Sequence, residues 1–142
     1  MDHTLALDDQ LCFALYAASR AVTARYRPLL EDLGLTYPQY LVLLVLWERG
    51  DVPVKDLGAA LQLDYGTLSP LLKRLEAAGL VRRERRADDE RSVRVALTGQ
   101  GVALRGRAER VPPAMGAAMD LDAADAERLR ALLRTLAANV SR

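Results

Sequence analysis

The sequence is poor in the residues that most often bind metals or form disulfides, with one cysteine, Cys12, and one histidine, His3. A single cysteine cannot form a disulfide within the chain, which suits a reducing cytosol, and we therefore expect a cytoplasmic protein. One cysteine and one histidine cannot build a usual zinc site. We accordingly expect neither a metal nor a cofactor.

Long apolar segments are also missing. The longest, Tyr40–Trp47, has eight residues, whereas a membrane-spanning helix needs roughly 20. No segment has the pattern of a secretory signal. We expect no membrane partner.

The chain lacks a strong overall charge, with a net charge of +1, but its charges are unevenly placed. Residues 73–94 carry eight basic and five acidic side chains, a local net charge of +3, whereas residues 1–50 have four basic and six acidic ones, a net of −2. A local basic element can neutralise DNA phosphates even on a nearly neutral protein, because charges are screened over about 10 Å. The alternative is that residues 73–94 form a solvated, charged hairpin with no DNA partner.

Helical periodicity dominates both ends of the chain. Apolar or small residues recur every three or four positions over 8–33, which predicts a long first helix. Thr36 and Gln39 have the spacing of a capping box and predict a second helix reaching about Gly50. Near the C-terminus, Asp122 is placed to cap a last amphipathic helix. Two such helices must bury their apolar stripes against each other or against a second copy.

Between these ends, the pattern predicts a helix-turn-helix followed by a β-hairpin. A short third helix extends to about Leu61, and Asp64 can cap a fourth that stops at Gly79. Strands at 80–86 and 92–97 flank the polar loop 87–91, and Thr98 can cap a fifth helix that the Val111-Pro112-Pro113 stretch should end or kink.

The fold class predicted is therefore mainly α with a small β-hairpin, a winged helix-turn-helix. We expect one domain over 1–142, with the helix-turn-helix and wing at 51–98 and dimerisation helices at 1–35 and 99–142. A homodimer matches the two-fold symmetry of palindromic DNA.

The fourth helix is the candidate recognition helix. Its leucines, at positions 68, 71, 72 and 75, would face the core, and Pro70 is unusual because a proline removes a hydrogen bond within a helix. Side chains that can contact bases or phosphates are Asp64, Thr67, Ser69, Lys73 and Arg74. In the predicted wing, Asp89 can orient Arg91, and arginines are attracted to narrow minor grooves. The bland interpretation is an ordinary surface helix.

These segments resemble the MarR family of transcriptional regulators, through residues 68–76, Gly79-Leu80-Val81 and Asp89-Glu90-Arg91-Ser92. Residues 10–16, 26–30 and 35–41 are similar to its organic hydroperoxide resistance branch. That resemblance implies a repressor that binds palindromic operator DNA when reduced and is released when organic hydroperoxide oxidises Cys12. It further implies that Tyr26 and Tyr37 hydrogen-bond this thiol across the dimer. Asp64, Thr67, Ser69, Lys73, Arg74 and Arg91 carry over as DNA contacts.

The residues around Cys12 support this role independently. If Asp8 caps the first helix, the free N–H groups of its first turn favour a thiolate at Cys12, although Asp8 and Asp9 oppose it. Tyr16 lies one turn further on the same face. With no second cysteine available, the chain resembles the one-cysteine type, in which a sulfenic acid could react with a low-molecular-weight thiol.

Three alternatives remain at this point. A MarR-type regulator that responds to a phenolic or anionic ligand would leave Cys12 as a bystander, and a lone cysteine is by itself more often inert core. A thiol peroxidase would need a reductant path and an activating base, and no motif for either is present, so we expect no enzyme. A protein-interaction module would explain the terminal helices but not the basic element beside a helix-turn-helix.

Overall fold

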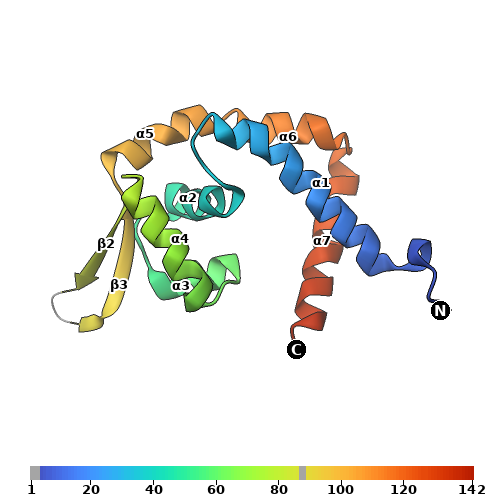
Figure 1. Ribbon diagram of the computed structural model, residues 1–142, viewed down its shortest axis with the longest axis horizontal. Coiled ribbons are helices and arrows are strands. Elements are labelled where there is room, and N and C mark those ends of the chain that lie inside the picture. The colour runs from blue at the N-terminus through green and yellow to red at the C-terminus, as the bar shows by residue number, and fades with distance from the viewer. Residues whose placement is uncertain (1–3, 87–88) are drawn as a thin grey trace. The chain divides into compact units, whose positions relative to one another are not determined.

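The computed structural model describes residues 4–86 and 89–142, and it is mainly helical with one small sheet, as predicted (Figure 1). The chain divides into two compact units, residues 1–111 and 112–142. In chain order the elements are η1 (Leu7–Asp9), α1 (Leu11–Glu31), α2 (Tyr37–Arg49), β1 (Val52–Pro53), α3 (Val54–Leu61), α4 (Tyr65–Ala77), β2 (Val81–Arg86), β3 (Asp89–Leu97), α5 (Gly99–Ala108), α6 (Val111–Met119) and α7 (Ala123–Val140).

The first helix begins later than predicted. Asp8 and Asp9 belong to the 3₁₀ turn η1, so Gln10 and not Asp8 is the N-cap residue of α1. The Gln10 side chain instead donates hydrogen bonds to the carbonyls of Thr4 and Ala6, at 2.7 and 2.9 Å, which holds the turn against the helix start. The prediction that Asp8 caps this helix is therefore wrong.

Local capping signals correctly placed the second and fourth helices. At the start of α2, the Thr36 hydroxyl accepts a hydrogen bond from the Gln39 N–H, and the Gln39 side chain accepts one from the Thr36 N–H. At the start of α4, the Asp64 carboxylate accepts from the Thr67 N–H at 2.7 Å. Pro70 lies within α4 without ending it. The four leucines of α4 are buried as predicted, at 68, 71, 72 and 75.

The wing contains one strand more than predicted. The sheet has the antiparallel order β1-β3-β2, with Val52 opposite Val95 and Pro53 opposite Arg94. Strand β1 has only two residues, too few to show the alternating pattern of a strand, and its partner β3 is distant in sequence. The sequence around β1 therefore gives no sign of a strand. Strand β3 begins at Asp89, earlier than expected, and the hairpin is irregular between Arg85 and Arg86.

The core of the first unit lies between α2, the helix-turn-helix and the sheet. Leu43, Leu57, Leu75 and Val95 are fully buried there. The Trp47 indole N–H of α2 donates to the Gly101 carbonyl of α5 at 2.9 Å, so Trp47 joins these two helices. This packing fixes α2 against both the helix-turn-helix and α5.

The terminal helices differ from the core in what they bury. The 21-residue α1 buries only Leu30, and the 18-residue α7 buries none of its residues. Asp122 caps α7 as predicted, with its carboxylate accepting from the Asp125 N–H at 2.8 Å. Helix α5 ends before the two prolines, which lie in the first turn of α6, where a missing N–H costs little. The sequence did not predict α6 as a separate helix.

In the described part of the chain, no helix is both long and apolar enough to span a membrane.

Candidate redox and DNA-binding sites

Three tyrosines from two helices form one cluster. The rings of Tyr26 on α1 and Tyr37 on α2 have centroids 4.6 Å apart, so the structure brings together the pair singled out from the sequence. The ring of Tyr40 lies 5.9 Å from Tyr26 and 6.4 Å from Tyr37. Sequence reasoning missed Tyr40, although its position three residues after Tyr37 places it on the same side of α2.

The phenols of this cluster remain hydrogen-bond donors at neutral pH. Burial raises the pKa of Tyr37 above its ordinary value. Burial also raises the pKa of Tyr26 and of Tyr40, and the neighbouring Tyr37 adds to both shifts. A neutral phenol can donate to an anion without adding a buried charge.

Cys12 is the second residue of α1, and its side chain is exposed. The N–H groups of a first helical turn have no partner within the helix, and they attract negative charge. The later start of α1 therefore brings Cys12 closer to those groups than the sequence indicated. One turn further, Tyr16 is 59% exposed, and the Arg20 guanidinium lies 5.6 Å above its ring.

Cys12 and the tyrosine cluster are far apart within one chain. Cys12 and Tyr26 lie 14 positions apart on α1, and the one proline inside this helix, Pro28, follows both of them. At 1.5 Å per residue this separation is about 21 Å along the helix axis, well beyond hydrogen-bond distance. A thiolate bonded by Tyr26 must therefore come from another chain.

The exposed face of α4 carries most of the predicted DNA contacts. Thr67, Lys73 and Arg74 are exposed and Ser69 is partly so, opposite the buried leucines. Asp64 is exposed as well, but its carboxylate is engaged as the helix cap, and the hydrogen bond from the Thr67 N–H lowers its pKa.

The basic residues of the wing are partly neutralised within the protein. Arg83 forms an ion pair with Glu76 at 3.1 Å, and Arg82 pairs with Glu84. For Asp89 and Arg91 the structure gives the backbone within β3, and their side chains lie outside the described part. The predicted orientation of Arg91 by Asp89 stays a prediction.

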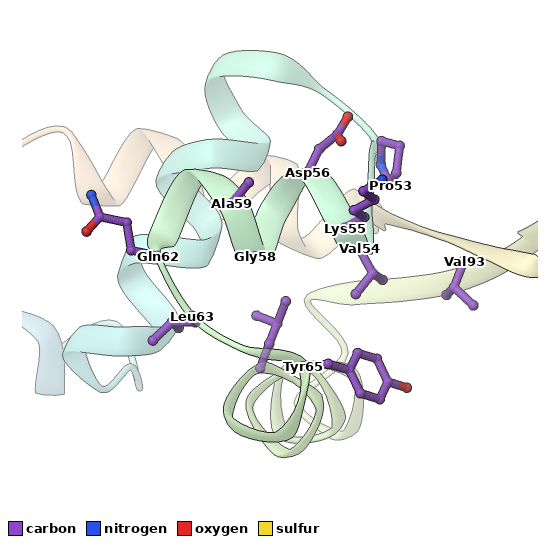
Figure 2. Close-up of a pocket in the computed structure, with 11 residues that line it drawn as sticks. Pro53, Val54, Lys55, Asp56, Gly58, Ala59, Gln62, Leu63, Tyr65 and Val93 are labelled. Atoms are coloured by element: carbon purple, nitrogen blue, oxygen red, sulfur yellow. The ribbon is translucent and has the colours of Figure 1, made fainter. Parts of the chain in front are cut away.

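An open pocket of about 810 Å³ lies between α3, the start of α4 and β3 (Figure 2). Its lining is mainly apolar and includes Pro53, Ala59, Leu63 and Val93. The polar and charged residues of the lining are Lys55, Asp56, Gln62 and Tyr65. The pocket adjoins the N-terminal end of the candidate recognition helix.

Comparison with known proteins identifies the family. Residues 35–93 match the MarR family. The organic hydroperoxide resistance transcriptional regulator of Bacillus subtilis is 47% identical over 135 residues, covering 95% of this chain and 91% of that protein. This chain belongs to the MarR family.

Other MarR relatives are equally informative. The regulator TtmR of Methylorubrum extorquens is 54% identical over 138 residues, covering 96% of this chain and 68% of that protein. A solved structure of reduced AbfR bound to DNA has a TM-score of 0.80 at 35% identity, covering 95% of this chain and 92% of AbfR. AbfR, which is from Staphylococcus epidermidis, has also been solved in an overoxidised form bound to DNA. These relatives are DNA-binding regulators and not enzymes.

The segment that matches the family covers the helix-turn-helix and part of the wing, but neither Cys12 nor Tyr26. It extends from the residue before the α2 cap into β3. These two positions lie within the comparisons that span nearly the whole chain.

Proposed function

We propose that this MarR-family chain is a peroxide-responsive repressor. As a homodimer it would bind palindromic operator DNA while Cys12 is reduced, and an organic hydroperoxide would release it by oxidising Cys12. DNA binding is supported by the exposed polar face of α4 and by the DNA-bound relative AbfR.

A homodimer is supported by the unburied apolar residues on the terminal helices. On α1, Leu11 is 70% and Leu15 39% exposed, and on α7, Leu129 is 46% and Leu133 38% exposed. On each helix these leucines form an apolar row, and exposed apolar patches on soluble proteins often mark interfaces. The proposed interface consists of Leu11, Leu15, Val22, Leu129, Leu133 and Leu136.

The observation that carries the redox assignment is the separation of the thiol from the tyrosine cluster. Each chain has an exposed thiol at the start of α1 and the Tyr26 phenol about 21 Å further along that helix. The phenol of Tyr37, on α2, packs against Tyr26. An antiparallel arrangement of two α1 helices would place each thiol beside the other chain's phenols. Tyr26 and Tyr37 would then donate to the thiolate of Cys12 of the partner subunit, with Tyr16 beside the thiol on its own helix.

The oxidation needs the peroxide, the thiolate and one proton from the solvent. The thiolate sulfur attacks the terminal oxygen of the hydroperoxide, an S–O bond forms, and the O–O bond breaks. The leaving alkoxide takes up a proton and departs as the alcohol, which leaves a sulfenic acid on Cys12. A low-molecular-weight thiol can then displace water from the sulfenic acid and form a mixed disulfide.

Binding of a fluorescent palindromic duplex, followed by anisotropy with and without an alkyl hydroperoxide, tests this proposal. We expect the wild-type dimer to be released from the duplex after stoichiometric oxidation. The Cys12→Ser dimer should stay bound to it. Intact mass must accompany each titration, because the solved structure of overoxidised AbfR is bound to DNA. Release of Cys12→Ser by the same peroxide would contradict the assignment.

The pocket beside α4 favours one alternative, a regulator controlled by a phenolic or anionic ligand. A ligand held near Lys55 and Tyr65 would lie close to the proposed DNA contacts and would compete with the duplex. In that case a small aromatic acid would release wild type and Cys12→Ser equally, without any peroxide.

A further inference from the structure

We propose that Tyr40 is a positioning residue of the redox site, whose buried ring sets the orientation of Tyr26 and Tyr37. This inference rests on the proposed function, because the group that the two phenols serve is the thiolate of Cys12 of the partner subunit. Neither the sequence motifs nor the comparisons assign Tyr40 a role.

The three rings form a closed arrangement in which each one contacts the other two. Their centroid distances are 4.6, 5.9 and 6.4 Å, and their planes are inclined by 38° to 45°. Aromatic pairs at 4.5–7 Å gain roughly 0.5–1.5 kcal/mol beyond the burial of their surface. A change in one ring therefore alters the preferred orientation of both others.

Tyr40 is the fixed member of this group. Its side chain is 3% exposed, whereas Tyr26 and Tyr37 are only partly buried. It is followed on α2 by Val42 and Leu43, which are fully buried, and the capping box holds the start of the helix. An aromatic side chain with two dihedral angles is well immobilised in such a site.

Tyr40 also connects two helices. Tyr37 lies on α2 with it, but Tyr26 comes from α1, and the ring of Tyr40 contacts both. Removing the ring would leave one side of each remaining phenol without packing. Their hydroxyls would then sample more orientations, and fewer of these would meet the thiolate.

The structure favours the ring over the hydroxyl of Tyr40 as the acting group. The described contacts of Tyr40 with this cluster are ring contacts, and no hydrogen bond links its hydroxyl to Tyr26 or Tyr37 among the described residues. Burial raises the pKa of Tyr40, so that it stays neutral and adds no charge to the site at physiological pH.

The pH profile of Cys12 alkylation in the reduced, full-length dimer tests the proposal. Tyr40→Phe keeps the ring, and we expect its profile to match that of wild type. Tyr40→Leu removes the ring, and we expect the alkylation rate near pH 7 to fall on the order of 3- to 10-fold, with the midpoint moved to higher pH. Tyr40→Met, which fills space flexibly, provides a second ring-free variant if Tyr40→Leu folds poorly.

Leu57→Ala is the matched control, because Leu57 is fully buried on α3 and outside the tyrosine cluster. We expect Leu57→Ala to lower stability while keeping all three rings, and to leave the midpoint unchanged. An equal shift in Leu57→Ala would show a general effect of stability and overturn the proposal.

Two other results would also overturn it. If the alkylation midpoint shifts as much in Tyr40→Phe as in Tyr40→Leu, the hydroxyl and not the ring is responsible. If Tyr40→Leu and Tyr40→Met both keep the wild-type profile, Tyr40 has no role in positioning the phenols. Failure of the proposed function looks different, because Cys12→Ser would then still be released from DNA by peroxide.

Discussion

At the scale of single residues, the surroundings divide the five tyrosines into two groups. Tyr16 and Tyr65 are 59% and 67% exposed, whereas the other three pack ring to ring between α1 and α2. Residue type alone could not make this division. The buried phenol donors therefore all belong to the cluster of Tyr26, Tyr37 and Tyr40.

Removing single hydroxyls from this cluster tests its proposed work on the thiolate. Tyr26→Phe and Tyr37→Phe keep the rings, and each loses one donor to a charged group, an interaction typically worth about 1.5–3 kcal/mol. We expect the midpoint of Cys12 alkylation to rise by on the order of one to two pH units in each variant. Oxidation by an alkyl hydroperoxide at neutral pH should slow accordingly, and superimposable profiles would defeat this role.

The cap of α4 should make stability depend on pH. The hydrogen bond from the Thr67 N–H lowers the pKa of Asp64 in the folded protein. Ionised Asp64 therefore contributes stability that is fully present above about pH 4, the usual range of an unfolded aspartate, and lost as the pH falls through its folded pKa.

Asp64→Asn provides the comparison, since its amide oxygen can accept the same bond at any pH. We expect the wild type to lose stability relative to Asp64→Asn below about pH 4, measured as urea midpoints from pH 7 to 3. Glu48→Gln should show no such trend, because Glu48 makes no hydrogen bond or ion pair among the described residues. A constant difference between wild type and Asp64→Asn at every pH would show that the carboxylate charge is unimportant.

At the scale of helices and strands, the sequence predicted what local chemistry decides. Thr36, Asp64, Thr98 and Asp122 cap helices as expected, because each cap involves residues within one turn. Strand β1 was missed because it depends on pairing with a distant partner. The start of α1 was misplaced because Asp8, a good cap by type, lies in a 3₁₀ turn.

The site shows the same limit. Cys12, Tyr26 and Tyr37 were proposed from motifs, and the spacing along α1 means that the proposed contact between thiol and phenols needs a second chain. Tyr40 required three-dimensional packing, since in the sequence it stands at the start of an ordinary apolar run.

The contact between α5 and the start of β2 has no room for a side chain at Gly101. A Cβ there would lie 2.2 Å from the Leu80 carbonyl oxygen, whereas one at Gly106 on the same helix would meet nothing within 4 Å. We expect Gly101→Ala to lower the free energy of unfolding by about 1–3 kcal/mol. Gly106→Ala should raise it by up to about 1 kcal/mol, through helix propensity.

Urea unfolding of the two variants at equal concentration checks this prediction. An unchanged free energy in Gly101→Ala would mean that α5 can shift away from β2 at little cost. The Trp47 hydrogen bond to Gly101 should weaken together with this contact, which tryptophan fluorescence can follow.

At the scale of the whole molecule, the apolar stripe of α7 should determine assembly. Leu133 is 38% exposed, and it shares one side of the helix with Leu129 and Leu136. Arg134 lies on the other side by helical spacing. We expect Leu133→Glu to shift sedimentation at micromolar concentration from dimer to monomer and to reduce DNA affinity, and Arg134→Glu to remain dimeric. If the wild-type protein is monomeric under these conditions, the proposed interface is wrong.

The short strand β1 limits the movements by which the proposed oxidation of Cys12 could release DNA. It follows α2 after two residues and pairs with β3. The Arg94 guanidinium of β3 also donates hydrogen bonds to the carbonyl and the carboxylate of Asp51, at 3.1 and 3.2 Å. The wing is thereby tied to the end of the helix that carries Tyr37. Displacing α2 would carry the wing along instead of folding it away from the DNA.

If the wing moves together with α2, oxidation of a dimer would change mainly the distance between its two DNA-binding units. Symmetric operators set that distance at roughly 34–36 Å, or 10–10.5 base pairs from centre to centre. Oxidation would then act as a mismatch of spacing, and a duplex with one base pair inserted or deleted between its half-sites should regain affinity for the oxidised dimer.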